Sequence, residues 1–266
     1  MHTRRMFGCI LGGLPMTEPC DLCHSSALES IYEPTLSRRG LTVYLCSDCG
    51  LVQSQPRADR TPRPATVSNS ADRKNVNTEA SLALIAAQGD LHANLRVLHL
   101  GSNRDSFARA MLATVPGALM TCVEADEAIP LPDWGFDIVH SCGTIEQRVS
   151  PANTLADLWR VLKPGGLLII DAPNIALIGG DDIADEWFVD TQLYHFSEVT
   201  LARLLDATGF EIVAGPDPKD RGNLLFAARK AKRPARSQQR NPGEVDGALA
   251  LITSYVNYRV RTQRAA

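Results

Sequence analysis

Two pairs of cysteines near the N-terminus have the residue type and spacing that bind a metal ion. Two residues separate Cys20 from Cys23, and two residues separate Cys46 from Cys49. Two turns of this kind can each offer two thiolates to one tetrahedral Zn²⁺ ion. We therefore predict a small zinc-ribbon-like module over residues 20–56, with these four cysteines as the zinc ligands.

The same cysteines admit other interpretations, namely two disulfides, buried free thiols, or iron bound as in rubredoxin. Gly50 directly follows the second pair and lets the backbone curl its amides towards sulfur, which favours a metal. A metal-type pattern also suits a reducing compartment, because disulfides persist in oxidising ones. We therefore expect a cytoplasmic protein. Cys9 and Cys122 fall outside the pattern and are expected to be core thiols.

A second group of residues has the spacing of a nucleotide-binding site. The run RVLHL predicts a strand that ends at Gly101, and a helical pattern follows it. A strand, a glycine turn and a helix bring backbone N–H groups close to a ligand. Glu124 lies twenty-three positions after Gly101, at the end of the next predicted strand. An acidic side chain there can accept hydrogen bonds from both ribose hydroxyls of a cofactor.

These residues need a framework of alternating strands and helices to position them. The fully apolar run 167–170 is typical of a strand buried on both faces of a parallel sheet. The alternation predicts an α/β fold with a doubly wound, Rossmann-like sheet. We expect strands at 96–100, 119–123, 136–140, 167–170, 210–213 and 223–228, and helices at 79–88, 104–115, 151–162 and after Ser197.

Length and composition limit the classes of function. The chain has 266 residues, of which 44% are hydrophobic and 21% are charged, enough for one catalytic domain and one small module. The net charge of -3 gives no bulk attraction to phosphate, so we do not expect a nucleic-acid partner. No run of about 18 apolar residues occurs, so we expect no membrane span.

The domain boundaries follow from these patterns. We expect a disordered leader over 1–19, with the true start at Met1 or Met16. We do not interpret it as a secretory signal, because glycines break the apolar run that such a signal would need. After the module come a linker over 57–78 and a catalytic domain over 79–230. Residues 231–266 are predicted to form a basic linker and a C-terminal helix, which could pack on the core or form a homodimer.

Several motifs in the second half resemble, in order and chemistry, those of class I S-adenosylmethionine-dependent methyltransferases, over about residues 95–229. The front part is similar to the zinc-binding domain that precedes certain bacterial methyltransferases, among them sugar C-methyltransferases. It reads CDLC and then YLCSDCGLVQ. The resemblance implies S-adenosylmethionine as cofactor and methyl transfer to the oxygen or carbon of a small molecule, such as a sugar or glycan precursor. The methyltransferase motifs are HLGSNRDSF, TCVEADEA, PLPDWGFDIVHS, RVLKPGGLLIIDAPN and LYHFSEVTLARLLDATGF.

The resemblance also assigns cofactor contacts. Gly101, Ser102 and Asn103 would line the methionine part, and Glu124 would hold the ribose. Ser141 and Cys142 would lie beside the sulfonium. Phe136 follows Glu124 by only twelve positions, where the family usually fits a helix and another strand. Either that βα unit is absent, or the second strand is misassigned and Asp126 makes the adenine contact.

Two residues are candidates for catalysis on the same resemblance. The family segment H-V-L-E-H reads here as G-T-I-E-Q over 143–147, so both histidines are missing and Glu146 remains. His195, in the motif LYHFS, could reach the acceptor side of the pocket or be a packed structural histidine. A general base needs a pKa near the working pH, which either residue could supply. The acidic segment 181–190 could bind sugar hydroxyls or be a solvated loop.

Two other functions remain open from the sequence. The glycine loop differs from the GSNDG of the family, because Arg104 and Asp105 stand where the family has Asp-Gly. This loop, the short interval after Glu124 and the missing histidines would suit a degenerate fold that binds or assembles without catalysis. RNA methylation is a third possibility, since some ribosomal RNA methyltransferases carry an N-terminal zinc module. The sequence lacks the strip of aromatic and basic residues that such binding uses. We therefore expect a small-molecule acceptor as the partner.

Overall fold

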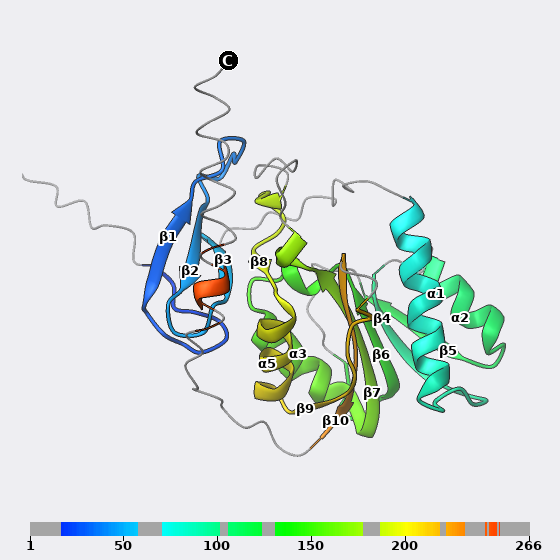
Figure 1. The fold of residues 1–266 in the computed structure, drawn as a ribbon. Coiled ribbons are helices and arrows are strands. Elements are labelled where there is room, and N and C mark those ends of the chain that lie inside the picture. The colour runs from blue at the N-terminus through cyan, green and yellow to red at the C-terminus, as the bar shows by residue number, and fades with distance from the viewer. Residues whose placement is uncertain are drawn as a thin grey trace, which may run out of the picture.

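The fold consists of two β-sheets with helices between and beside them (Figure 1). This computed structural model describes residues 17–57, 71–101, 106–123, 131–177, 187–218 and 222–231, together with 243, 245–248 and 250. Residues 1–16 of the predicted leader and almost all of the predicted C-terminal helix lie outside these residues, whereas Glu18 and Pro19, predicted as part of the disordered leader, contact Arg57.

The larger sheet has six strands in the order β5-β4-β6-β7-β10-β9. Strands β5, β4, β6 and β7 run parallel, and β10 and β9 add two antiparallel strands at the far edge. The predicted Rossmann-like sheet is therefore confirmed. The strand bounds are β4 (Arg96–Leu100), β5 (Leu119–Val123), β6 (Phe136–Cys142), β7 (Leu162–Pro173), β9 (Phe210–Ala214) and β10 (Asn223–Lys230).

Strand β5 forms one edge of this sheet. In the part of the chain that the structure describes, no strand pairs with its outer side, and β6 is the next element after it. The described sheet thus lacks the βα unit that the family usually inserts here. The short interval before Phe136 was the signal for this in the sequence.

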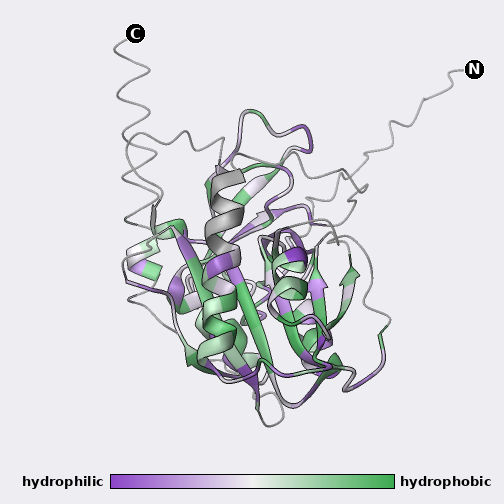
Figure 2. Ribbon diagram, turned by 90° about the vertical axis from the view of Figure 1, so that its right-hand side faces the viewer, coloured by the Kyte–Doolittle hydropathy of each residue, from purple (hydrophilic) through white to green (hydrophobic). Residues whose placement is uncertain are grey.

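Helices cover both faces of the six-stranded sheet (Figure 1). One face carries α1 (Ala71–Ala87) and α2 (Ser106–Thr114), and the other carries α3 (Pro151–Val161) and α5 (Glu198–Ala207). Alternate residues of each strand enter two separate apolar clusters, because successive side chains of a strand point to opposite faces. The hydropathy colouring of Figure 2 shows the strands of this sheet as largely hydrophobic. We call the two sides the α1 face and the module face.

The smaller sheet lies beyond α3 and α5, on the module face (Figure 1). Its order is β1-β2-β3-β8, and it contains β1 (Leu28–Tyr32), β2 (Thr42–Cys46) and β3 (Val52–Gln55). The fourth strand, β8 (Tyr194–His195), comes from the other half of the chain and pairs antiparallel with β3. The cysteine module therefore shares a sheet with the methyltransferase half.

Two local features differ from the sequence predictions. Helix α1 begins at Ala71, so it takes in the last eight residues of the segment predicted as a linker. That stretch reads ADRKNVNT, which is polar and has no apolar periodicity to recognise. Residues 163–166, predicted as a turn, lie within β7, where the register with β6 is irregular: Phe136 pairs with Leu162, but Ile138 pairs with Leu167. A Cβ on Gly166 would lie 2.9 Å from the carbonyl oxygen of Lys163, so this irregularity needs glycine.

Among the described residues, no helix is both long enough and apolar enough to cross a membrane.

Candidate functional site

The four cysteines of the two pairs converge on one point. Their Sγ atoms all lie within 4.8 Å of one another. The Sγ atoms of Cys20 and Cys49 are 3.5 Å apart, and those of Cys23 and Cys46 are 3.6 Å apart. These distances exceed the disulfide bond length of about 2.05 Å. In a tetrahedral site with Zn–S bonds of about 2.3 Å, neighbouring sulfurs are about 3.8 Å apart. The arrangement therefore fits a four-thiolate zinc site.

The two turns that carry these cysteines have the same shape. The amide of His24 donates to the carbonyl of Cys20 over 2.8 Å, and the amide of Gly50 donates to the carbonyl of Cys46 over 2.9 Å. His24 and Gly50 both have positive φ, at 59° and 79°. A positive φ is easy for glycine and uncommon for histidine. The repeated geometry points the thiols of both turns inward, and the Gly50 signal was correctly placed by the sequence.

The second candidate site lies at the carboxyl ends of the parallel strands. Gly101 follows β4 with φ of 150°, a conformation that favours glycine, and its amide donates to the carbonyl of Val123 over 2.8 Å. Ser141 on β6 pairs in register with Leu100, directly before this glycine. Cys142 pairs with Asp171 on β7.

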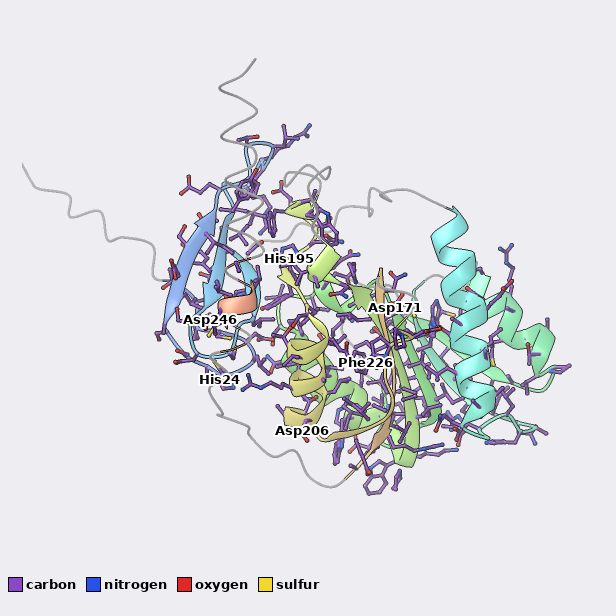
Figure 3. All side chains as sticks on the ribbon, in the orientation of Figure 1. His24, Asp171, His195, Asp206, Phe226 and Asp246 are labelled. Atoms are coloured by element: carbon purple, nitrogen blue, oxygen red, sulfur yellow. The ribbon has the colours of Figure 1, made fainter. Side chains whose placement is uncertain are left out.

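These strand ends bring Gly101, Ser141 and Cys142 to one edge, as the sequence predicted. Four other predicted cofactor residues, Ser102, Asn103, Glu124 and Asp126, lie outside the described residues, so their cofactor contacts stay predictions. Figure 3 labels Asp171 at this edge of the sheet. The edge is where ligands of open α/β sheets bind.

Glu146 lies close to this edge, on a short 3-10 turn, η1 (Ile145–Gln147), that follows β6. Its side chain is buried, and Oε2 has no hydrogen-bond partner among the described residues. Burial raises the pKa of this carboxyl to about 7, although hydrogen bonds from its own amide and from Gln147 oppose the rise. A Cβ on Gly143 would lie 4.0 Å from Oε1, so the carboxyl packs under the turn after β6.

His195 is buried on β8, in the smaller sheet. Its Nε2 is 3.4 Å from the hydroxyl of Ser54, and its ring meets Phe188 edge-on at 4.7 Å. Burial lowers its pKa to about 3, so the ring is neutral at physiological pH. Figure 3 shows it between the central sheet and the module. The structure gives His195 and Glu146 separate partners, and the catalytic role of each stays a prediction.

A buried histidine pair beneath the glycine turn was not predicted as a unit. The Nδ1 atoms of His99 and His140 are 2.9 Å apart, and the two residues are register partners on β4 and β6. Nε2 of His140 is 3.0 Å from the sulfur of Cys142 and 3.3 Å from the hydroxyl of Ser81 on α1. Burial, assisted by His99, lowers the pKa of His140 well below its usual value. Each histidine lies near the end of a predicted strand, which was the signal available in the sequence.

The acidic segment 181–190 is only partly described. Its last member, Asp190, accepts from the hydroxyl of Ser37 over 2.6 Å and from the amide of Arg38 over 3.1 Å. Both donors belong to the loop between β1 and β2. This carboxylate therefore holds the module loop, which corrects the expectation that it binds a substrate hydroxyl.

A family model described as a methyltransferase domain matches residues 71–214, more than half of the chain. The chain therefore belongs to the methyltransferase domain family. The match begins at the first residue of α1. The family predicted from the ordered motifs is thus confirmed, and the chain carries a domain of the S-adenosylmethionine-dependent class.

One curated relative comes from Mycolicibacterium smegmatis and bears the name "Probable S-adenosylmethionine-dependent methyltransferase". It is 33% identical over 85 residues, which make up 32% of this chain and 32% of that protein. The match thus spans about a third of the length of this relative.

Solved structures of methyltransferases are also similar to this chain. A SAM-dependent methyltransferase from Aquifex aeolicus is 15% identical, covers 61% of this chain and 94% of its own, and gives a TM-score of 0.47. The 1,6-didemethyltoxoflavin-N1-methyltransferase of Burkholderia thailandensis, solved with 1,6-didemethyltoxoflavin and S-adenosylhomocysteine, is 20% identical. It covers 76% of this chain and 100% of its own, with a TM-score of 0.46.

Proposed function

We propose that this protein transfers a methyl group from S-adenosylmethionine to a small-molecule acceptor and that its four-cysteine module holds one Zn²⁺. Family membership and the carboxyl edge of the sheet support the cofactor, and the sulfur positions support the metal. The acceptor class that we propose is a sugar or glycan precursor, methylated at oxygen or carbon. This class rests on the likeness of the front part to the zinc-binding domain of sugar methyltransferases.

The observation that carries the proposal is the buried side chain of Glu146, which lies next to the edge of the sheet where the parallel strands end. Its pKa of about 7 and its unpartnered Oε2 match what a general base requires at neutral pH. Such a group takes up a proton readily at the pH where it is half ionised. It would accept the proton that a hydroxyl or an acidic carbon of the acceptor loses.

The bound cofactor would supply an electrophilic methyl group on a good leaving group, so alignment provides much of the rate. Gly101 has no side chain and a positive φ, so it lets the cofactor approach the end of β4 closely. Ser141 and Cys142 would lie beside the reacting centre. The hydroxyl of Ser141 is fixed by Thr144, whose Oγ1 is 2.7 Å away. This pair holds the turn between β6 and η1 in place.

Binding of the cofactor is the first test. We expect calorimetry to show that S-adenosylhomocysteine binds the full chain, and no binding at near-millimolar cofactor would refute the proposal. A tritiated-methyl transfer screen over sugar nucleotides and free sugars then tests the acceptor class. Turnover with RNA and not with sugars would instead support the RNA methyltransferase hypothesis.

Glu146→Gln tests the base, because glutamine keeps the shape but cannot take up a proton. We expect kcat to fall about 10²-fold or more, with S-adenosylhomocysteine binding unchanged. In the unaltered enzyme kcat should rise with pH and level off above about 7, since the carboxyl must be ionised to act. Glu211→Gln, at an exposed carboxyl on β9, is the matched control. Equal kcat values for both variants would exclude Glu146 as the base.

A further inference from the structure

The segment 145–152 connects the end of β6 to the first turn of α3 and contains Glu146. We call it the η1–α3 segment. Its hydrogen-bond partners come to a large extent from the cysteine module and from β8, both far away in the sequence. A segment that carries a candidate base at its start is thus held from outside the methyltransferase sheet.

The most direct of these contacts is made by Asp21, the residue that follows Cys20 within the first cysteine pair. Its Oδ1 accepts from the hydroxyl of Ser150 over 2.7 Å, and its Oδ2 accepts from the amide of Ala152 over 2.8 Å. Ser150 is the N-cap residue of α3. A carboxylate at this position satisfies an otherwise unpaired amide and interacts favourably with the helix dipole. The cysteine turn therefore caps a catalytic-domain helix from outside.

A second contact reaches the segment through Tyr194 on β8. Its hydroxyl donates to the carbonyl of Val149 over 2.9 Å and accepts from Nη1 of Arg57 over 2.5 Å. Arg57 lies just after β3, and its Nε donates to the carboxylate of Glu18 over 2.8 Å. The guanidinium is buried, so this chain of hydrogen bonds is shielded from water.

The third contact holds Glu146 itself. The amide of Leu193 donates to the carbonyl of Glu146 over 2.9 Å, and the carbonyl of Leu193 accepts from the amide of Ser54 over 2.7 Å. One residue thus joins the module strand β3 to the turn that carries the carboxyl. Moving β3 would move Leu193 and, with it, the backbone of Glu146.

We infer that the cysteine module is a positioning element for the η1–α3 segment, with Asp21 as the positioning residue that ties the cysteine turn to it. Asp21 lies between two predicted metal ligands, so the fold of that turn fixes where its carboxylate lies. A module that only tethered a separate activity would have no reason to cap α3 or to hold Glu146. The inference rests on the proposed function for the role of Glu146, and on geometry alone for the coupling.

Hydrogen–deuterium exchange on the zinc-loaded full chain tests the coupling without any acceptor. In Asp21→Ala we expect the amides of 147–154 to exchange about five- to tenfold faster, as for the loss of a helix cap, with one zinc per chain retained. Asp21→Asn keeps an oxygen acceptor and should restore part of the protection. Asp48→Ala, which removes a carboxylate from the second cysteine pair, is the matched control and should leave these amides unchanged.

Carbon-13 NMR of the Glu146 carboxyl, assigned by comparison with Glu146→Gln, adds a readout that a general loss of stability would not move. We expect this carboxyl to titrate near pH 7 in the unaltered protein. In Asp21→Ala it should titrate closer to its ordinary value, because a loosened turn lets water reach it. If Asp21→Ala loses zinc, Asp21→Asn is measured in its place, because Ser150→Ala would also remove the hydrogen bond that the Ser150 side chain accepts from the amide of Asn153.

The outcomes separate the two ideas. Unchanged exchange and an unchanged Glu146 titration in a zinc-bound variant that lacks the Asp21–Ser150 contact would overturn the positioning inference. Failure of the unaltered protein to bind S-adenosylhomocysteine would overturn the proposed function and leave the exchange result standing. Faster exchange at 147–154 in zinc-bound Asp21→Ala, but not in Asp48→Ala, would establish the coupling.

Discussion

The two faces of the six-stranded sheet are built from the same strands but depend on different parts of the chain. On the α1 face, the apolar cluster takes its residues from α1, α2 and the strands, all within the methyltransferase half. On the module face, the cluster continues from the strands through α3 and α5 into Cys20, Cys46 and Cys49. The core of the α1 face is built from one half of the sequence, whereas the core of the module face contains residues from both halves.

This difference teaches where a metal could influence the methyltransferase. A face that is packed only by nearby helices does not require the cysteine turns to be formed. The module face does, because its core and the capping of α3 include residues of those turns. We therefore expect perturbations of the cysteine module to loosen one face of the sheet before the other.

Removal of a thiolate should have the largest effect. In Cys46→Ser we expect zinc to be lost and the smaller sheet to unfold, since structural zinc contributes on the order of 10 kcal/mol to such modules. Amide exchange should then rise in β1, β2, β3, α3 and α5, and remain slow in α1 and β4. Metal analysis and exchange mass spectrometry measure both effects.

Cys122→Ser, at a half-buried thiol outside the cluster, is the control for this prediction. It should keep its zinc and its exchange pattern. Equal loosening of the two faces in Cys46→Ser would show that the sheet is one cooperative unit. Slow exchange in a metal-free module would contradict the zinc proposal itself.

Two arginines provide a smaller test of the same contrast. Arg57→Ala removes a side chain that is 5% exposed and binds Tyr194, Glu18 and the carbonyl of Pro19. We expect the free energy of unfolding to fall by about 2–3 kcal/mol, because the partners of Arg57 lose their hydrogen bonds in a buried site.

Arg160→Ala is the comparison variant for Arg57→Ala. Its side chain is 35% exposed, and its ion-pair partner Asp133 is 61% exposed. Exposed pairs of this kind contribute less than about 1 kcal/mol. Urea denaturation followed by circular dichroism gives both values. Similar losses for the two variants would mean that the junction between module and sheet is no more important than an ordinary surface pair.

The contrast between the faces also explains what the sequence could predict. The strands of the large sheet and the helices α3 and α5 have local signals, such as the apolar run 167–170 and the cap at Ser197, and most of their bounds were predicted closely. Strand β7 is the exception, because it extends to 162–173 through the glycines that indicated a turn. The two cysteine pairs were predicted as one cluster because their spacing is itself the signal. Gly101 was placed correctly because a strand followed by glycine is a local pattern.

What the sequence missed depends on contacts between distant residues. Nothing next to Tyr194 and His195 indicates that they pair with β3, because register partners more than a hundred residues away decide it. Asp21 has the composition of an ordinary turn residue, and its role as an external cap needs the position of α3. Asp190 likewise looked like part of an acidic substrate loop until its partners, Ser37 and Arg38, were known.

Acidification should lower the free energy of unfolding gradually, by a small amount for each pH unit, and it acts on both faces of the sheet. His195 on the module side has a folded pKa of about 3, against an ordinary value of 6.5. Between these values only the unfolded chain binds the proton, so lower pH favours unfolding. The free energy of unfolding should fall by about 1.4 kcal/mol per pH unit below 6.5 on account of this residue. In His195→Gln that share of the slope should vanish, and His92→Gln, at an exposed position, is the control.

The histidine pair on the α1 face makes the pH test discriminating. His140 also has a lowered pKa, through burial and the neighbouring His99, so its contribution has the same sign. At pH 5 we expect amides of both faces to have lower protection factors than at pH 7, each measured rate being divided into the intrinsic rate at its own pH. His195→Gln should then restore protection on the module face only, if the faces open separately. Restoration on both faces would contradict that separation, because removing the proton uptake of His195 would then protect α1 and β4 as well.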